Sequence, residues 1–281
     1  MSEIKNLDFS VAMSVYKGDK KEEFEEALNS ILNQNVKPKE IVIVLDGPVE
    51  SGIAESIILA KKTWRKVIDI VTIQFKKNQG LGKALRAAVL KCKFEWIARM
   101  DSDDISVPDR FEKQIEYITN HPETDIVGGQ ISEFINNENE CVGIRNVPLK
   151  DREIKEYLKC RSPFNHVTVF FKKDAVLRSG NYREWPYNED YFLWIRMAEA
   201  GCIFGNIDKV LVKVRVGKEM YKRRGGFEYF KSEKGIQWYM LKRGIIRRNE
   251  FIRNVLIRFL VQRVMPDSLR GLFFKYFARK H

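Results

Sequence analysis

The chain has 281 residues, of which 44% are hydrophobic and 31% charged, and this composition supports a packed core in either one large domain with an appendage or two small domains. No uninterrupted apolar run approaches the length of a membrane span, and the first six residues lack the apolar core of a signal peptide. The four cysteines are far apart and form no C-x-x-C pair, which excludes a disulfide framework and a zinc site and indicates reduced thiols in a cytosolic setting.

The net charge of +12 is concentrated near the C-terminus. Residues 209–281 contain 20 Lys and Arg against 5 Asp and Glu, which gives a net charge of +15. Residues 1–208 contain 30 Lys and Arg against 33 Asp and Glu, which gives a net charge of −3. A basic tail on a near-neutral domain indicates an anionic partner, and nucleic acid and anionic lipid are both candidates.

Strands and helices alternate along the first hundred residues. The predicted strands are residues 9–15, 41–45, 67–73 and 96–100. Apolar residues at helical spacing follow the first strand from Phe24 to Leu32, and a further helix opens at residues 78–84. The second strand is a continuous apolar run, which is typical of a strand buried on both faces of a parallel sheet. The pattern therefore predicts a parallel sheet with helices on both faces.

The second half of the chain has a less regular pattern. Phe111, Ile115 and Ile118 predict a helix, and a second helix begins after Asn188. The predicted strands of this half are residues 125–131, 167–171, 202–204 and 210–215.

Carboxylates crowd the exit of the fourth strand, in the sequence Asp101-Ser102-Asp103-Asp104. Asp46 ends the second strand, so Asp46 and Asp101 fall at the sheet edge where parallel sheets bind ligands. Crowded carboxylates repel one another, and a hard divalent cation such as Mg²⁺ or Mn²⁺ removes that cost. A solvated acidic turn is the alternative, and a calcium loop is excluded because Ile105 and Ser106 occupy positions that need a ligand and a glycine.

Several ordered motifs together resemble a family 2 glycosyltransferase of the GT-A fold. They are Ser14-Val15-Tyr16, Leu45-Asp46-Gly47, Asn78-x-Gly80, Asp101-Ser102-Asp103-Asp104, Asn165-His166 and Glu189-Asp190. The resemblance runs from about Phe9 to Arg215 and implies an α/β, Rossmann-like, mostly parallel sheet flanked by helices. It implies a catalytic domain over residues 1–215 and a basic helical extension over residues 216–281. The segment from Val214 to Gly226 further resembles bacterial transferases that build O-antigen, capsule or exopolysaccharide repeat units.

Two departures from the family pattern matter. Gly47 follows Asp46 where many relatives have a second aspartate, so recognition of the base rests on one carboxylate. The Q-x-x-R-W signature of processive synthases is absent, which indicates transfer of a single sugar rather than polymerisation.

The resemblance implies a nucleotide-diphospho-sugar donor, with UDP the favoured nucleotide, and a Mn²⁺ or Mg²⁺ cofactor. The residues that it assigns to the donor are Tyr16, Asp46, Asn78, Lys83 and Asp101. Asp101 and Asp103 would hold the metal against the diphosphate, and Asp104 would orient them. On turn chemistry alone, Asp46 fits a turn-forming aspartate equally well, and the segment from Asn78 to Gly80 fits a simple helix-entry loop.

The resemblance also places an acceptor site in the second half of the chain. Asp190 is the predicted general base, and Glu189 is predicted to bind acceptor hydroxyls. His166 is predicted to shape this site, and Arg223 and Arg224 to bind the diphosphate of a polyprenyl-diphosphate-linked sugar. The alternative for Glu189 and Asp190 is that they cap a helix, and the alternative for His166 is that it is a structural histidine.

The tail carries an amphipathic helical pattern. Its apolar members are Phe251, Ile252, Val255, Leu256, Phe259, Leu260 and Val264, with Arg247, Arg253, Arg258 and Gln262 on parts of the remaining arc. This pattern predicts binding to an anionic membrane surface, and the alternative is a helix docked on the domain with a solvated basic face. We expect a cytoplasmic protein, peripheral on the inner face of the cell membrane.

The function that these expectations favour is an inverting, metal-dependent hexosyltransferase acting in bacterial surface polysaccharide biosynthesis. A nucleotidyltransferase is one alternative, although the segment from Tyr16 to Asp19 lacks the glycine-rich phosphate loop of that class. A nucleic-acid-binding protein that uses the basic tail is another. No helix-turn-helix, zinc-finger or RNP pattern supports it, so no nucleic acid partner is expected.

Overall fold

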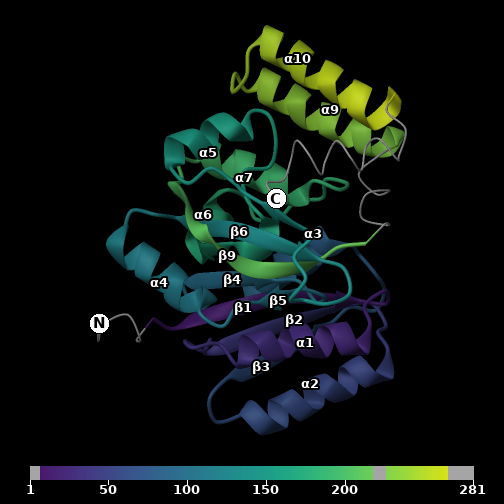
Figure 1. The fold of residues 1–281 in the computed structure, drawn as a ribbon, viewed down its shortest axis with the longest axis vertical. Helices are drawn as coiled ribbons and strands as arrows, with labels where there is room; N and C mark the ends of the chain where they lie inside the picture. Colours follow the sequence, from purple (N-terminus) through teal and green to yellow (C-terminus); the bar gives the residue numbers. More distant parts are fainter. Residues whose placement is uncertain (1–6, 218–225, 265–281) are drawn as a thin grey trace.

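The computed structural model of the chain describes residues 7–217 and 226–264. A nine-stranded sheet lies between helices on both faces, and a helical hairpin lies at the end of the molecule far from α1 and α2 (Figure 1). The strands are β1 (Phe9–Tyr16), β2 (Glu40–Asp46), β3 (Asp69–Gln74), β4 (Trp96–Met100), β5 (Ile105–Ser106), β6 (Ile126–Phe134), β7 (Gly143–Arg145), β8 (Phe170–Lys172) and β9 (Phe204–Arg215). The helices are α1 (Lys21–Leu32), α2 (Ser51–Trp64), α3 (Leu81–Lys91), α4 (Arg110–Asn120), α5 (Asp151–Leu158), α6 (Lys173–Arg178), α7 (Glu189–Glu199), α9 (Phe227–Lys242) and α10 (Arg248–Phe259).

The first four strands form the predicted parallel sheet. They lie in the order β3-β2-β1-β4, and each pair of neighbours is parallel. The sheet then becomes mixed, because β8 pairs antiparallel with both β4 and β6, whereas β6 and β9 are parallel. The carboxyl ends of β1, β2 and β4 therefore meet at one edge, as the sequence predicts.

Both faces of the sheet are buried. Phe9, Val11 and Met13 of β1 point into a core shared with α1, α2 and α4, whereas Ala12 points into a second core shared with α3, α6 and α7. Side chains alternate between the faces of a strand, so a strand buried on both faces must be apolar at nearly every position. This is the physical basis of the continuous apolar runs in β1 and β2.

Two of the predicted strands begin later than expected. The third begins at Asp69 rather than residue 67. Residues 167–171 are not one strand, because His166–Thr168 form a short 3₁₀ helix and β8 begins only at Phe170. The Thr168 hydroxyl accepts a hydrogen bond from the Gly129 amide (3.0 Å), and this contact competes with an extended conformation.

The two late strands predicted at residues 202–204 and 210–215 are instead one long strand, β9. The backbone of β9 pairs with β6 on both sides of Asp208 and Lys209, and the register shifts beside Gly129 and Gln130.

Helices α9 and α10 pack against each other beyond α5 and α7 (Figure 1). Ile236 and Met240 of α9 enter the same core as α7. The helix predicted in the tail is present, but its buried residues, Asn254 and Arg258, are polar, whereas Ile252 and Leu256 are 63% and 55% exposed. Helix α10 is therefore docked on the domain, as the alternative predicts, but Arg258 is buried rather than solvated.

The Arg258 guanidinium forms an ion pair with Glu233 of α9 (2.6 Å) and donates to the Cys160 carbonyl. Asn254 donates to Gln237 (2.9 Å) and to the Lys159 carbonyl (3.0 Å). This polar network orients α10 with its apolar side outward. No helix of residues 7–217 and 226–264 is both long and apolar enough to cross a bilayer, and all four cysteines are free thiols.

Candidate active site

The acidic loop after β4 is held from two sides by the end of β9. The Arg215 amide donates to the Asp104 carboxylate (2.8 Å), and the Arg215 guanidinium donates to the Asp103 carbonyl (3.2 Å). The same guanidinium forms an ion pair with Glu26 of α1 (2.6 Å). Asp103 and Asp104 are therefore attached to the end of β9 rather than part of a fully solvated turn.

The three aspartates of this loop fit a divalent cation. One carboxylate oxygen from each of Asp101, Asp103 and Asp104 lies within 4.8 Å of the others. Burial and the neighbouring carboxylates raise the pKa of Asp103 to about 7 and raise the pKa of Asp104 well above its usual value. A cation would offset this repulsion, and an all-oxygen donor set suits Mg²⁺ or Mn²⁺.

Two further charged residues support the loop. The Arg99 guanidinium, which is only 4% exposed, pairs with the Asp101 carboxylate. Ser102 donates to Asp19 (2.7 Å), whose carboxylate also accepts from the Tyr16 amide (2.9 Å). Burial raises the pKa of Asp19, with smaller contributions from Asp101 and Glu23. The acidic cluster therefore includes a carboxylate from the loop after β1.

Glu189 and Asp190 begin α7, as predicted. The preceding residue, Asn188, donates to Ser232 of α9 (3.0 Å), so the helical hairpin fixes the start of α7. Burial raises the pKa of Glu189 to about 7, with a further contribution from Asp190. Burial also raises the pKa of Asp190, although hydrogen bonding and the charges of Arg99 and Arg145 oppose this shift. The pKa values of both carboxyl groups are therefore higher than the pKa of a solvated carboxyl group.

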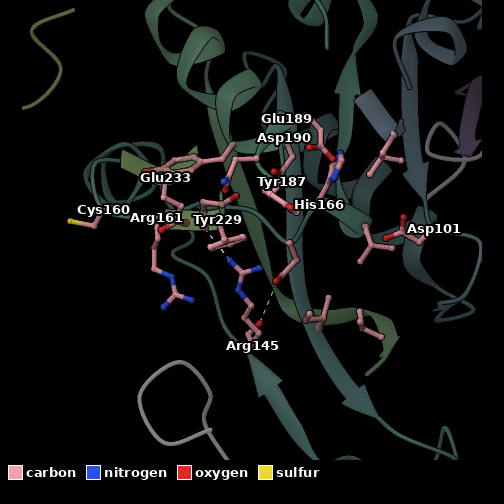
Figure 2. Close-up of a pocket in the computed structure, with 18 of the residues that line it drawn as sticks. Asp101, Arg145, Cys160, Arg161, His166, Tyr187, Glu189, Asp190, Tyr229 and Glu233 are labelled. Atoms are coloured by element: carbon pink, nitrogen blue, oxygen red, sulfur yellow. Dashed lines mark hydrogen bonds between the residues drawn. The ribbon is translucent and has the colours of Figure 1, made fainter. Parts of the chain in front are cut away.

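A pocket of about 570 Å³ connects the acidic loop to α7 (Figure 2). Of the predicted site residues, it brings together Asp101, His166, Glu189 and Asp190, and Asp104 also lines it. Residues of α9 and α10 complete the wall, among them Glu233 and Arg258. The volume lies within the range of small-molecule sites.

His166 has the partners of a structural histidine, although it also lines the pocket. Its Nε2 atom lies 2.8 Å from the Tyr182 hydroxyl, and its ring packs edge-on against Trp194. Burial lowers its pKa well below the usual value, with a smaller contribution from the charge of Arg99. The ring is therefore neutral at physiological pH and suited to shaping the pocket.

The other predicted donor residues do not line this pocket. Tyr16 is 41% exposed beside the acidic loop, Asn78 donates to the Asp46 carbonyl (3.3 Å), and Lys83 forms an ion pair with Glu184 (2.8 Å). Asp103 lies in the acidic cluster but outside the pocket lining. Arg223 and Arg224 lie outside the described residues.

Asp46 is 2% exposed, and its carboxylate accepts hydrogen bonds from the amides of Gln79 (2.6 Å) and Gly80 (2.8 Å). Asp46→Ala should therefore lower the free energy of unfolding by about 1–3 kcal/mol, because it leaves two amides without their acceptor. Urea denaturation measures the loss. The matched control is Asp69→Ala, since the Asp69 carboxylate forms an exposed ion pair with Lys93 and its loss should cost about 0–1 kcal/mol. Equal losses of stability in the two variants would show that the hydrogen bonds to Asp46 do not stabilise the fold.

The sequence-based prediction misses Arg99, Arg145, Arg161 and Glu233 of the pocket wall, and it assigns Arg258 to the tail helix rather than to the pocket. A signal for Arg99 exists, because it is a charged residue inside an otherwise apolar strand. The other three lie on separate segments that only the tertiary fold brings together. No local pattern identifies them.

The comparisons with known proteins agree on one family. Residues 10–179 match the family model described as glycosyl transferase family 2, and residues 96–277 match the model described as glycosyl transferase family group 2. The chain is 40% identical over 212 residues to the amylovoran biosynthesis glycosyltransferase AmsE of Erwinia amylovora, covering 75% of this chain and 77% of that protein.

A second relative matches over almost the full length. It is the UDP-Gal:alpha-D-GlcNAc-diphosphoundecaprenol beta-1,3-galactosyltransferase of Escherichia coli, 38% identical over 272 residues and covering 97% of each chain. Among solved structures, S. aureus TarS 1-349 in complex with UDP-GlcNAc matches with a TM-score of 0.67 at 17% identity, covering 94% of this chain and 76% of that one. Together, the family model and the full-length relative establish that this chain belongs to glycosyltransferase family 2 and has the GT-A fold.

Proposed function

We propose that the chain is an inverting, metal-dependent hexosyltransferase that moves one sugar from a UDP-sugar to a lipid-linked acceptor in bacterial surface polysaccharide biosynthesis. The observation that carries this proposal is one pocket into which both Asp101 of the acidic loop and Asp190 of α7 project. Such a site has a place for a charged leaving group and a place for a base. The similarity to a diphosphoundecaprenol galactosyltransferase supports the lipid-linked acceptor.

In this proposal, the donor lies along the carboxyl ends of β1, β2 and β4. Tyr16 stacks on the base, and Asp46 holds the loop that carries Asn78 and also reaches the base or ribose. Lys83 leaves its exposed ion pair with Glu184 for the diphosphate, an exchange that costs little because surface ion pairs are weak. Asp101 and Asp103 hold Mn²⁺ or Mg²⁺, which supplies charge stabilisation for the departing nucleoside diphosphate.

Asp190 takes the proton from the acceptor hydroxyl as the hydroxyl oxygen attacks the anomeric carbon. The raised pKa of Asp190 supports this role, because a base is most effective when its pKa approaches the working pH. Glu189 binds the acceptor hydroxyls, and His166 shapes the pocket wall. A single displacement inverts the anomeric carbon, so an α-linked donor gives a β-glycoside.

The test is a panel of UDP-, GDP- and TDP-sugars offered with a polyprenyl-diphosphate sugar acceptor in the presence of Mn²⁺. We expect release of UDP from one member of the panel, dependent on the acceptor. Release of pyrophosphate would instead indicate a nucleotidyltransferase. Release of no nucleotide from any donor would contradict the proposal.

The same proposal places the protein on the anionic inner face of the cell membrane, with residues 1–215 as the catalytic domain and residues 216–281 as a basic extension. The outer side of α10 supports this placement. Exposed apolar side chains follow it in a stripe, here called the α10 ridge, made up of Ile252, Leu256, Ile257, Phe259 and Leu260. Exposed Arg247, Arg248 and Arg253 lie on the same helix or at its start. Apolar and basic groups together are typical of helices that lie in a membrane surface.

The double variant Ile252→Ser, Leu256→Ser should bind phosphatidylglycerol vesicles at least about tenfold more weakly than the wild type, because two side chains no longer enter the bilayer. Vesicle sedimentation at low and high salt measures this, and salt should weaken the wild type as well. The control is Ile58→Ser, Leu59→Ser, a change of two side chains that are 66% and 65% exposed on α2, at the other end of the molecule (Figure 1). Equal binding of the vesicles by both double variants would contradict the proposal that the α10 ridge contacts the membrane.

A further inference from the structure

The pocket has charges of opposite sign at its two ends. Asp101 lies at one side of the view in Figure 2, Arg161 lies at the other side, and Arg145 lies below Asp190. The acidic end is accounted for by the proposed metal and base. The basic end has no role in the proposed transfer, and its arginines point to an anionic part of a ligand.

Arg145 is held in place by the fold. It ends β7, where it pairs with Ile131 of β6, and its carbonyl accepts from Asn165 (3.3 Å). Its guanidinium donates to the Ser162 carbonyl (3.0 Å). The charge of Arg145 also lowers the pKa of Asp190, so the two groups lie within electrostatic reach of each other. A ligand that reaches Asp190 can therefore also reach Arg145.

Arg161 approaches the pocket from the segment after α5. Its guanidinium carbon lies 5.6 Å from the centre of the Tyr157 ring, which limits its orientations. Glu233 also lines this end of the pocket, and the Arg258 guanidinium compensates its charge at 2.6 Å. The basic end of the pocket is therefore not neutralised by Glu233.

An apolar surface begins where the basic end meets α10. Ile257 lines the pocket and is 49% exposed, and it belongs to the α10 ridge. Leu256 and Leu260 lie within one helical turn of it. A ligand bound at the arginines can thus continue onto an apolar surface outside the pocket.

We propose that Arg145 and Arg161 form the subsite for the diphosphate of the acceptor, and that the first isoprenoid units leave the pocket over Ile257 onto the α10 ridge. The inference rests on the proposed function and names the part of the acceptor that each segment binds. Arg side chains match phosphate oxygens in charge and geometry. The acceptor sugar then lies between the diphosphate and Asp190.

The test uses farnesyl diphosphate as the probe, in EDTA so that no metal-bound donor site competes for the diphosphate. Binding is followed by titration calorimetry of the full chain. Wild type should bind farnesyl diphosphate more tightly than farnesol. Arg145→Gln and Arg161→Gln should each lower the affinity for farnesyl diphosphate by about 10–100-fold. Farnesol affinity should stay within about twofold, and the control Arg152→Gln, on α5 outside this pocket, should change neither ligand.

Equal affinity of wild type for farnesyl diphosphate and farnesol would overturn the subsite, as would an Arg161→Gln variant that binds like Arg152→Gln. Binding of UDP with Mn²⁺ is measured in parallel. Retained UDP binding shows that a variant is folded, and it reports on the proposed donor site separately from the acceptor subsite. If Arg145→Gln also loses UDP binding, Arg161→Gln alone decides the question, because Arg161 makes fewer contacts with the fold.

Discussion

Asp190→Asn should lower turnover by about 10²–10⁴-fold while the affinity for the nucleotide sugar stays nearly unchanged. Asparagine keeps the shape of the side chain but cannot accept the acceptor proton at neutral pH. The effect should fall on the chemical step, because the proposed metal ligands lie on a different element. Single-turnover kinetics with donor binding measured by calorimetry separates the two quantities.

Asp174→Asn is the matched control, since Asp174 is an exposed carboxylate on α6 paired with Arg178, outside the pocket. It should have wild-type turnover. Near-normal turnover of Asp190→Asn would remove Asp190 from the role of base and make Glu189 the next candidate. Lost donor binding would instead assign Asp190 to the nucleotide site.

Removal of divalent cations should abolish transfer. The acidic loop gathers three carboxylates whose mutual repulsion needs a compensating positive charge, and the leaving diphosphate needs the same. EDTA should lower turnover by at least about 10²-fold, and added Mn²⁺ should restore it. Asp103→Asn should stay inactive at any Mn²⁺ concentration that restores the wild type. The control Asp109→Asn, which alters a carboxylate paired with Lys113 on α4, should respond like the wild type.

The metal requirement should depend on pH. The pKa of Asp103 is raised to about 7 in the protein without metal, so protons compete with the cation below that pH. The Mn²⁺ concentration for half-maximal turnover should therefore rise as the pH falls from 8 to 6. Full turnover in excess EDTA, or a Mn²⁺ requirement that does not change with pH, would contradict this account of the loop.

Periodicity in the sequence predicts the first half of the fold because local and tertiary preferences agree there. β1, β2 and β4 are apolar on both faces, and the acidic residues follow where these strands end. Carboxylates at a sheet edge and at the start of a helix are visible as motifs. The acidic loop and the Glu189-Asp190 pair are therefore both present in the predicted positions.

The second half could not be predicted in the same way. Residues 167–171 favour a strand by composition, but a tertiary contact from Thr168 to Gly129 selects a helical turn. The period of α10 reveals two faces without saying which one is buried. That choice depends on Arg258 meeting Glu233 and on Asn254 meeting Gln237, and both contacts join separate helices. The arginines at the basic end of the pocket depend on tertiary contacts in the same way.

The stereochemistry of the product shows whether transfer proceeds by a single displacement. The wild type is given an α-linked UDP-sugar, Mn²⁺ and the polyprenyl-diphosphate sugar acceptor, and the new anomeric centre is assigned by its proton NMR coupling while UDP is counted. We expect one UDP per glycoside formed and a β-linked product, because one displacement assisted by Asp190 inverts the anomeric carbon. An α-linked product, or release of UDP without a glycoside, would contradict this mechanism.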